Sequence, residues 1–189
     1  LVQSTGGSVS ALVIGDANNA ASLGGFGAST VYQVSGAAFN QYTTGPWVRA
    51  IQAAVAAADP AVLLGAASAQ GRDAFPRLAA RLDIGMGSEC VDLWVADGKV
   101  VGRRPQYAGK ALTDVHISSG VAAFTVRPNS FSVPAASGAT AAVQSLDVAL
   151  EASDQATRVV DQEVSVQDVA DLTEADRIVS GGRSVKSSD

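Results

Sequence analysis

The clearest candidate for chemistry in this sequence is a glycine pair followed by an arginine near the C-terminal end. Gly181 and Gly182 follow a short β-branched run, Ile178-Val179, and precede Arg183 and a polar stretch. This order predicts a strand, a glycine turn and the start of a helix, where backbone N–H groups and a positive helix end can bind phosphate. Glycine lets a backbone approach a ligand closely, and arginine offers forked donors to phosphate oxygens. Because the spacing is not G-x-G-x-x-G, an ordinary turn stays open as the alternative.

Other glycine-containing segments do not complete a nucleotide-binding motif. Gly109-Lys110 is not a Walker loop, because Arg104 and Ala111 occupy the positions that require glycine and Ser or Thr. The loop at 16–27 is rich in glycine toward its end and could approach an adenine nucleotide. A flexible turn is the competing interpretation of that loop.

The sequence offers no complete set of residues for nucleophilic catalysis. Asp114 and His116 fall on one face of a predicted strand, but no G-x-S-x-G elbow accompanies them. We interpret the histidine as a surface or structural residue. Cys90 lies close to Glu89 and Asp92, which would raise the pKa of its thiol, so we expect a packed and unreactive side chain. No catalytic residue is therefore predicted.

Two arginine-containing segments are candidates for contact with a partner subunit or a neighbouring domain. Residues 103–110 form the densest basic cluster and include one aromatic residue, Tyr107. A polar loop at the end of a hairpin is the alternative for this segment. Arg127 ends a predicted strand, where it would anchor the following loop or face a cofactor cleft.

The composition disfavours several classes of protein. One histidine and one cysteine in 189 residues cannot form a zinc site, an iron–sulfur site or an internal disulfide, so no metal ligand is predicted. The net charge of −5 argues against nucleic-acid binding, and no apolar run reaches the ~18–20 residues of a membrane span. Nine of the 18 acids lie between Asp147 and Asp176, with Arg158 as the only base among them. Such a block predicts a solvated connector.

Hydrophobic periodicity predicts an α/β fold for the first half of the chain. Short apolar runs bounded by glycine indicate buried strands, and apolar residues at helical spacing between them indicate helices. This alternation favours a parallel twisted sheet with flanking helices. The predicted strands are 9–15, 30–34 and 61–65, and the predicted helices are 47–58 and 75–82.

After residue 87 the pattern changes to that of an antiparallel hairpin extension. Asp97-Gly98 is a strong turn signal between apolar runs at 90–95 and 99–102. Strands at 111–117 and 121–127 are expected to continue the extension, and 128–140 reads as a linker or edge loop. We expect three parts: an N-terminal α/β domain (1–145), an acidic connector with one more strand at 157–166 (146–174), and the first strand and turn of a second α/β domain (175–189).

Four separated blocks of sequence resemble the α subunit of electron transfer flavoproteins. They are residues 71–82 (GRDAFPRLAARL), 104–111 (RPQYAGKA), 125–131 (TVRPNSF) and 180–187 (SGGRSVKS). Each block is modest alone, whereas the four together are specific. The likeness covers nearly the whole chain.

The resemblance implies an electron carrier that uses FAD and is not a catalyst on its own. Family members are heterodimers that shuttle electrons from flavoprotein dehydrogenases to a membrane quinone reductase. The N-terminal domain would pack on the β subunit, and a C-terminal domain would hold FAD. By the same likeness Arg183 would contact FAD, with Gly181 and Gly182 beside it. Ser184 stands where a glycine is usual, and the first strand of the N-terminal domain would lie ahead of Leu1.

Two further functions stay open beside this one. The chain could be a heterodimer-assembly module without a cofactor, or an adenine-nucleotide-binding domain that uses the loop at 16–27. The N-terminal residues lack the charged start and long apolar run of a signal peptide. We therefore expect the cytoplasm of a bacterium, or the mitochondrial matrix if the source is eukaryotic, with no nucleic-acid partner and no insertion into a membrane.

Overall fold

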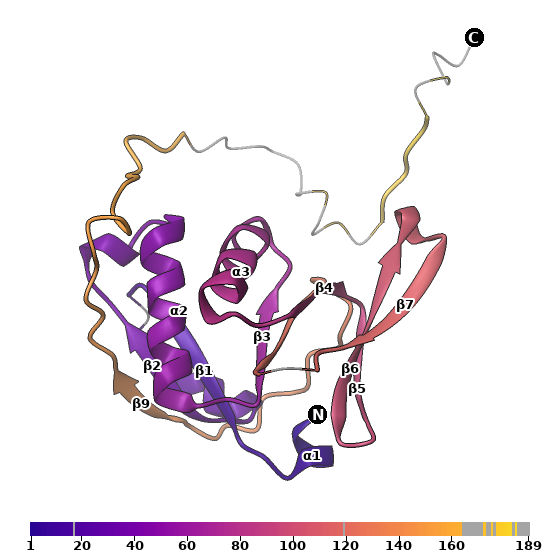
Figure 1. The fold of residues 1–189 in the computed structure, drawn as a ribbon, viewed down its shortest axis with the longest axis horizontal. Helices are drawn as coiled ribbons and strands as arrows, with labels where there is room; N and C mark the ends of the chain where they lie inside the picture. Colours follow the sequence, from indigo (N-terminus) through magenta and orange to yellow (C-terminus); the bar gives the residue numbers. More distant parts are fainter. Residues whose placement is uncertain are drawn as a thin grey trace. The chain divides into compact units, whose positions relative to one another are not determined.

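A computed structural model describes residues 1–16, 18–118, 120–163, 172, 175, 177–182 and 184, apart from the side chains of Val2 and Gln3. The chain divides into two units, residues 1–159 and residues 160–189. The described helices and strands all belong to the first unit (Figure 1). No helix in the described part of the chain is long and apolar enough to cross a membrane.

The first unit alternates strands and helices and then adds an antiparallel hairpin, as the sequence predicts. Its helices are α1 (Val2–Thr5), α2 (Thr44–Ala58) and α3 (Ala69–Leu82), with 3-10 turns η1 (Ala20–Phe26), η2 (Ala37–Phe39) and η3 (Tyr107–Gly109). Its strands are β1 (Val9–Ile14), β2 (Ala28–Val34), β3 (Val62–Ala66), β4 (Met86–Cys90), β5 (Asp92–Ala96), β6 (Lys99–Gln106), β7 (Ala111–His116), β8 (Ala122–Val126) and β9 (Ala142–Ser145).

The strands form two parallel sheets and one antiparallel sheet, which confirms the predicted fold class. The parallel sheets have the orders β1-β2-β9 and β3-β8-β4, and the antiparallel sheet has the order β5-β6-β7. Asp97 and Gly98 at the β5–β6 turn both have positive φ, 50° and 71°, as a two-residue hairpin turn of this kind requires. The antiparallel part is thus a three-stranded extension of a parallel α/β core.

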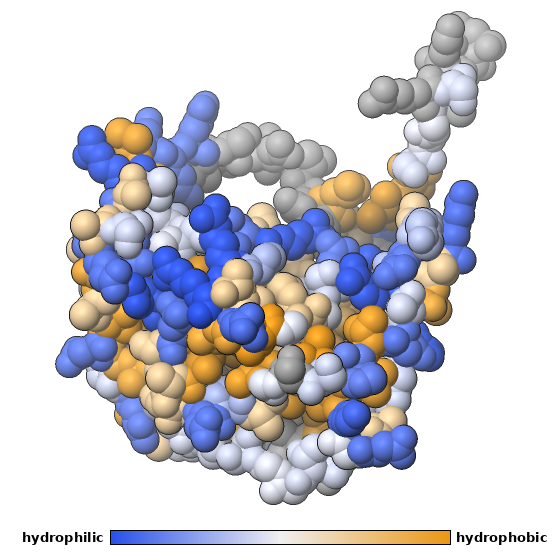
Figure 2. Space-filling view, in the orientation of Figure 1, coloured by the Kyte–Doolittle hydropathy of each residue, from blue (hydrophilic) through white to orange (hydrophobic). Residues whose placement is uncertain are grey.

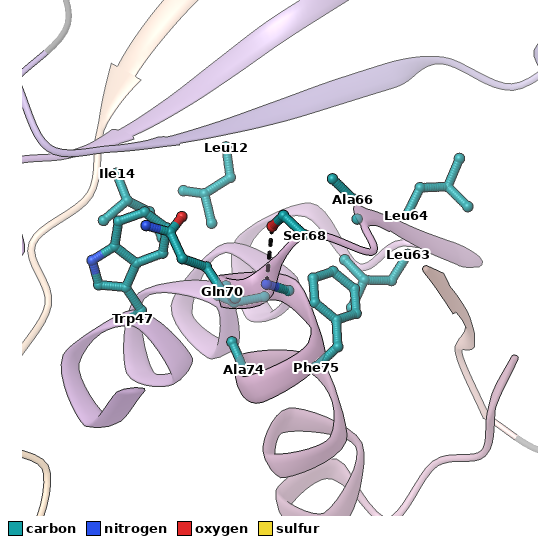
Figure 3. A pocket seen from close by; sticks show the side chains of 13 residues that line it. Leu12, Ile14, Trp47, Leu63, Leu64, Ala66, Ser68, Gln70, Ala74 and Phe75 are labelled. Atoms are coloured by element: carbon teal, nitrogen blue, oxygen red, sulfur yellow. Dashed lines mark hydrogen bonds between the residues drawn. The ribbon is translucent and has the colours of Figure 1, made fainter. Parts of the chain in front are cut away.

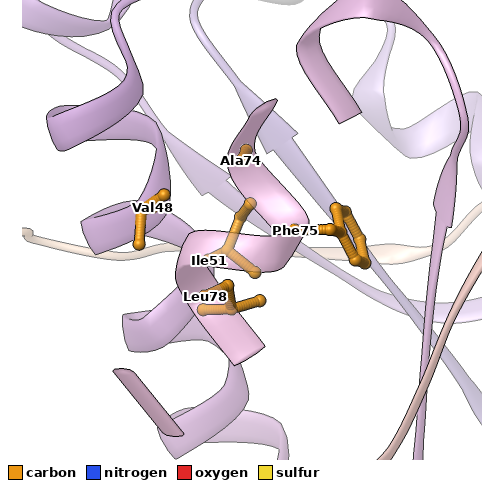
Figure 4. Close-up of a cluster of buried hydrophobic side chains, with 5 residues drawn as sticks. All are labelled: Val48, Ile51, Ala74, Phe75 and Leu78. Carbon is orange, nitrogen blue, oxygen red and sulfur yellow. The ribbon is translucent and has the colours of Figure 1, made fainter. Parts of the chain in front are cut away.

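Helices α2 and α3 cover one face of the parallel strands. Val48 and Ile51 of α2 meet Ala74, Phe75 and Leu78 of α3 in one buried cluster (Figure 4). Partly buried side chains of the strands pack against the cluster: Leu12, Ile14, Leu63 and Met86. The opposite face of β1, with Ala11 and Val13, packs near η1 and Ala141. Alternate residues of β1 therefore face opposite layers, as expected of a strand buried on both sides.

The structure corrects the predicted extent of the antiparallel part. Residues 121–127 were expected to extend the hairpin, but β8 pairs in parallel with both β3 and β4. Its burial explains the difference, because Ala123, Phe124 and Thr125 are all buried at the centre of the second sheet. The run predicted as one strand at 90–95 is also split, since β4 ends at Cys90 and β5 begins at Asp92.

Three further segments differ from the prediction. Strand β9, which follows the linker or edge loop expected at 128–140, was not predicted and pairs in parallel with β2. Within the strand predicted at 157–166, the described residues 157–163 are neither helix nor strand. The same holds for residues 177–180, where the first strand of a second domain was expected. A lone β-branched run does not form a strand, because its backbone needs a neighbouring strand for hydrogen bonds.

Candidate functional site

The glycine pair lies in the second unit of the chain and presents an open backbone. Gly181 and Gly182 are exposed, and a Cβ at Gly182 would meet only the Ser184 Oγ, at 3.7 Å. Arg183 lies outside the described residues. The described glycines leave room for a ligand to approach, but by themselves they do not enclose a site for FAD. Their role in FAD binding stays a prediction.

A hollow in the first unit lies between β1 and β3, the strands at the facing edges of the two parallel sheets. Two adjoining cavities of about 370 and 460 Å³ share Leu12 of β1, Ile51 of α2, and Leu63 and Leu64 of β3. Figure 3 shows the first of them, with Leu12 and Leu63 among its lining side chains. Among the described strands, β1 pairs only with β2 and β3 pairs only with β8. We call this hollow the β1–β3 groove. Figure 2 shows that apolar surface also lies open on the viewed face of the molecule.

Backbone polar groups of both strands point into the groove. The N–H of Gly15 donates to Val34 O at 2.8 Å, and the N–H of Ala67 donates to Val126 O at 2.7 Å. Successive residues of a strand direct their N–H groups to opposite sides. The N–H groups of Leu12 and Leu64 therefore face the groove rather than β2 or β8.

A polar cluster stands at the rim of the groove where α2 begins. The hydroxyls of Tyr42 and Thr44 both donate to the Asp73 carboxylate, the former at 2.7 Å. These two donors hold the pKa of Asp73 below its usual range. Burial, followed by the hydrogen bond to Asp73, raises the pKa of Tyr42 to about 12. The Trp47 ring packs edge-on against the Tyr42 ring, with 5.0 Å between the ring centroids. Because Thr44 belongs to α2 and Asp73 to α3, the cluster joins the start of α2 to α3.

The glycine-rich end of the 16–27 loop serves backbone packing. A Cβ at Gly24 would lie 2.3 Å from both Ala141 N and Thr140 C, and one at Gly25 would lie 3.4 Å from the Ala136 Cβ. Close approach of another chain segment thus accounts for these glycines. The observation removes the reason for assigning them to an adenine nucleotide.

The residues considered for nucleophilic chemistry are not brought together. The Asp114 carboxylate pairs with Arg103 through bonds of 2.7 and 2.8 Å, and His116 is exposed. Cys90 is fully buried, and burial raises the pKa of its thiol while the Arg104 charge opposes the rise. The thiol is packed as expected, but burial rather than its acidic neighbours is the cause.

In both arginine segments an arginine pairs with an acid. Arg103 is held between Asp114 and the Trp94 ring, whereas Tyr107 is 77% exposed at the tip of the loop. Arg127 pairs with Glu89 at 3.4 Å, in agreement with an anchoring role.

Sequence reasoning missed one buried polar site inside the acidic block. The Asp154 side chain is fully buried and pairs with Arg49 of α2 and Arg81 of α3. The only signal in the sequence was an arginine on each of two helices, and nothing linked Arg49 and Arg81 to one acid among nine.

Comparison with known proteins agrees with the fold. Residues 1–151 match the model of the electron transfer flavoprotein domain. An electron transfer flavoprotein subunit alpha from Syntrophomonas wolfei is 37% identical over 164 residues, 87% of this chain and 51% of the relative. The subunit alpha from Thermoanaerobacterium thermosaccharolyticum is 30% identical over 190 residues, 98% of this chain and 58% of the relative.

A eukaryotic relative extends the comparison. A probable electron transfer flavoprotein subunit alpha, mitochondrial, from Cryptococcus neoformans is 30% identical over 161 residues, 84% of this chain and 45% of the relative. The chain thus spans about half the length of the curated relatives it matches. The matched domain and these relatives show that the chain belongs to the electron transfer flavoprotein family and is related to its α subunits.

Proposed function

We propose that the chain forms the N-terminal part of an electron transfer flavoprotein α subunit. In the complete protein, FAD would take up electrons from flavoprotein dehydrogenases and pass them to a quinone reductase. The observation that carries this proposal is the family match over residues 1–151, with one relative aligned over 98% of the chain. When bound, FAD supplies the redox chemistry, and the residues of this chain would contribute to its binding and to subunit assembly.

The partner in this function would be a β subunit. The tip of the antiparallel sheet offers a surface for it, because Tyr107 and Leu112 are 77% and 61% exposed. Exposed aromatic and aliphatic side chains beside arginines are typical of protein interfaces. Lys110 follows Tyr107 in the turn that joins β6 to β7, and Arg103 lies farther back on β6.

Within the same proposal, Arg183 contacts FAD, and Gly181 and Gly182 let the backbone approach it. Substituting Arg183→Ala in the complete α subunit, paired with its β subunit, should weaken FAD binding about ten- to a hundredfold. That range corresponds to the loss of one charge-assisted hydrogen bond. Arg158→Ala, on an exposed residue of the first unit, is the matched control and should leave the Kd for FAD unchanged. Equal FAD affinity in the two variants would remove Arg183 from the site.

We also propose that the β1–β3 groove takes the first strand of the domain, which the resemblance places ahead of residue 1. Its walls are the free edges of two parallel strands, with backbone N–H groups of Leu12 and Leu64 directed inward. An apolar strand parallel to both would pair with each edge and join the two sheets into one. The groove is therefore assigned to the fold and not to a small-molecule substrate.

The cellular location follows the family. The Cryptococcus relative is named mitochondrial. For this chain we propose the cytoplasm if its source is bacterial and the mitochondrial matrix if it is eukaryotic.

A further inference from the structure

Asp154 is a buried acid that no proposed electron-transfer role uses. Its residue is 1% exposed, and its carboxylate accepts three hydrogen bonds. Arg49 Nε donates at 2.9 Å from α2, Arg81 donates at 3.0 Å from α3, and the Glu151 N–H donates at 3.1 Å from the same turn. A charge so far from water is stable only when it is paired and hydrogen-bonded in this way.

The segment that leads to Asp154 lies against the folded unit. After β9, the partly buried side chains of Leu146, Val148 and Leu150 pack on a buried cluster that contains Val34 and Ala50. The Leu146 N–H also donates to Gln33 O at 2.8 Å. Residues 146–154 thus form a strap over this side of the unit, and Asp154 is at its end.

At its end the strap packs closely against the backbone of α2 at Gly45. A Cβ on Gly45, in the first turn of α2, would lie only 2.0 Å from the Asp154 carbonyl oxygen. After Asp154 the chain is no longer packed: residues 155–163 are exposed and contain no helix or strand. The boundary between packed strap and exposed chain therefore coincides with the paired carboxylate.

We propose that Asp154 is a clasp that fixes the place where the folded N-terminal unit ends and the exposed connector begins. The clasp joins three elements, since its carboxylate bridges α2, α3 and the strap. Without the negative charge, the contacts that remain among the described residues are those of Arg49 with the exposed Glu151, at 2.8 Å, and of Arg81 with Gln52, at 3.2 Å. Neither remaining contact holds Asp154 itself, so the last residues of the strap are loosened, although Arg49 still pairs with Glu151.

Loosening of the last residues of the strap would lengthen the connector. The three residues from Glu151 to Ser153, which follow the packed Leu150, span about 10 Å when fully extended. Resting on the proposed function, this means that Asp154 sets the length of the connector that follows the N-terminal unit. Asp154 is a positioning residue in this sense and touches no cofactor.

Amide hydrogen exchange on the 189-residue chain tests the clasp without FAD or a β subunit. In Asp154→Asn, the amides of Glu151, Asp154 and Gln155 should exchange at least about tenfold faster. The last two now donate to Glu151 O and Ala152 O within the turn. Amides in the middle of α2 and α3, such as those of Ala50 and Ala79, should accelerate by a smaller factor, because they exchange through opening of the whole unit. Asp147→Asn makes the same change on an exposed acid of the same strap and should alter none of these rates.

A second variant separates a clasp from general stability. Arg81→Gln removes one of the two charged donors and should accelerate the same three amides by a smaller factor than Asp154→Asn. Unchanged exchange at 151–155 in Asp154→Asn would overturn the proposal. Equal acceleration across α2, α3 and the strap would also overturn it, because Asp154 would then support the whole unit rather than its end. Either result leaves the proposed electron-transfer function untouched.

Discussion

Replacing Phe124 with alanine tests whether β8 belongs to the centre of the core. Phe124 is fully buried, and its ring lies where Cβ atoms on Gly87 of β4 and Gly102 of β6 would approach it to 2.6 and 3.0 Å. Burying such a side chain stabilises the fold by about 1.5–3 kcal/mol, and the cavity left behind adds to the loss. We expect Phe124→Ala to lower the free energy of unfolding by about 3–5 kcal/mol.

Urea unfolding followed by far-UV circular dichroism measures this loss. With a slope of about 2 kcal/mol/M, the midpoint should fall by roughly 2 M relative to wild type. Phe131→Ala, on a side chain that is 43% exposed, is the control and should cost no more than about 1 kcal/mol. Phe124→Leu keeps most of the contact, so it should cost under about 1.5 kcal/mol and remain folded if the alanine variant does not. Equal losses for Phe124→Ala and Phe131→Ala would refute the central position of β8.

The remaining predictions concern the β1–β3 groove and the buried carboxylate. In a polypeptide that carries the family's first strand ahead of residue 1, the amides of Leu12 and Leu64 should exchange at least about tenfold more slowly than in the 189-residue chain. The exchange rates of the Val13 and Gly65 amides, which point toward β2 and β8, should change little. Slower exchange at only one of Leu12 and Leu64 would contradict a strand that pairs with both β1 and β3. Burial alone raises the pKa of Asp154, but the Glu151 N–H and the guanidinium groups of Arg49 and Arg81 hold it below its ordinary value. A carboxyl whose folded pKa is lowered stabilises the fold above its unfolded pKa of about 3.9, and this contribution is lost as the pH falls through the folded value. The stability difference between wild type and Asp154→Asn should thus be full at neutral pH and shrink below about pH 4, whereas a constant difference down to about pH 2 would contradict this reasoning.

Local sequence signals predicted the elements that depend on local chemistry. Glycine-bounded apolar runs identified β1, β2 and β3, and helical spacing identified α2 and α3. The Asp97-Gly98 turn identified the β5–β6 hairpin, because its dipeptide specifies the backbone geometry on its own. Predicting these elements requires no information about residues that are distant in the sequence.

The features that were missed depend on contacts between distant segments. An apolar run such as 122–126 can pair with a parallel or an antiparallel neighbour equally well. Only its position between β3 and β4 determines that the pairing is parallel. Strand β9 has four exposed residues and is defined by its pairing with β2 alone. Asp154 looks like its acidic neighbours in the sequence, and its partners are 73 and 105 residues away. Pattern and propensity carry no information at such separations.

The candidate site was predictable only through several motifs taken together. Gly181 and Gly182 alone are compatible with any exposed turn, and both are exposed among the residues that the structure describes. The blocks at 71–82, 104–111 and 125–131 led to the family, and the match over residues 1–151 confirms it. The contact of Arg183 with FAD is part of the proposed function and remains a prediction.

The visible absorption spectrum of the complete α subunit, purified together with a β subunit, tests the central claim most directly. We predict a stable heterodimer with the spectrum of oxidised FAD, which is lost on chemical reduction and returns on reoxidation. A heterodimer that is colourless after incubation with excess FAD, or an α subunit that forms no heterodimer, would contradict the assignment of this chain to a flavin electron carrier.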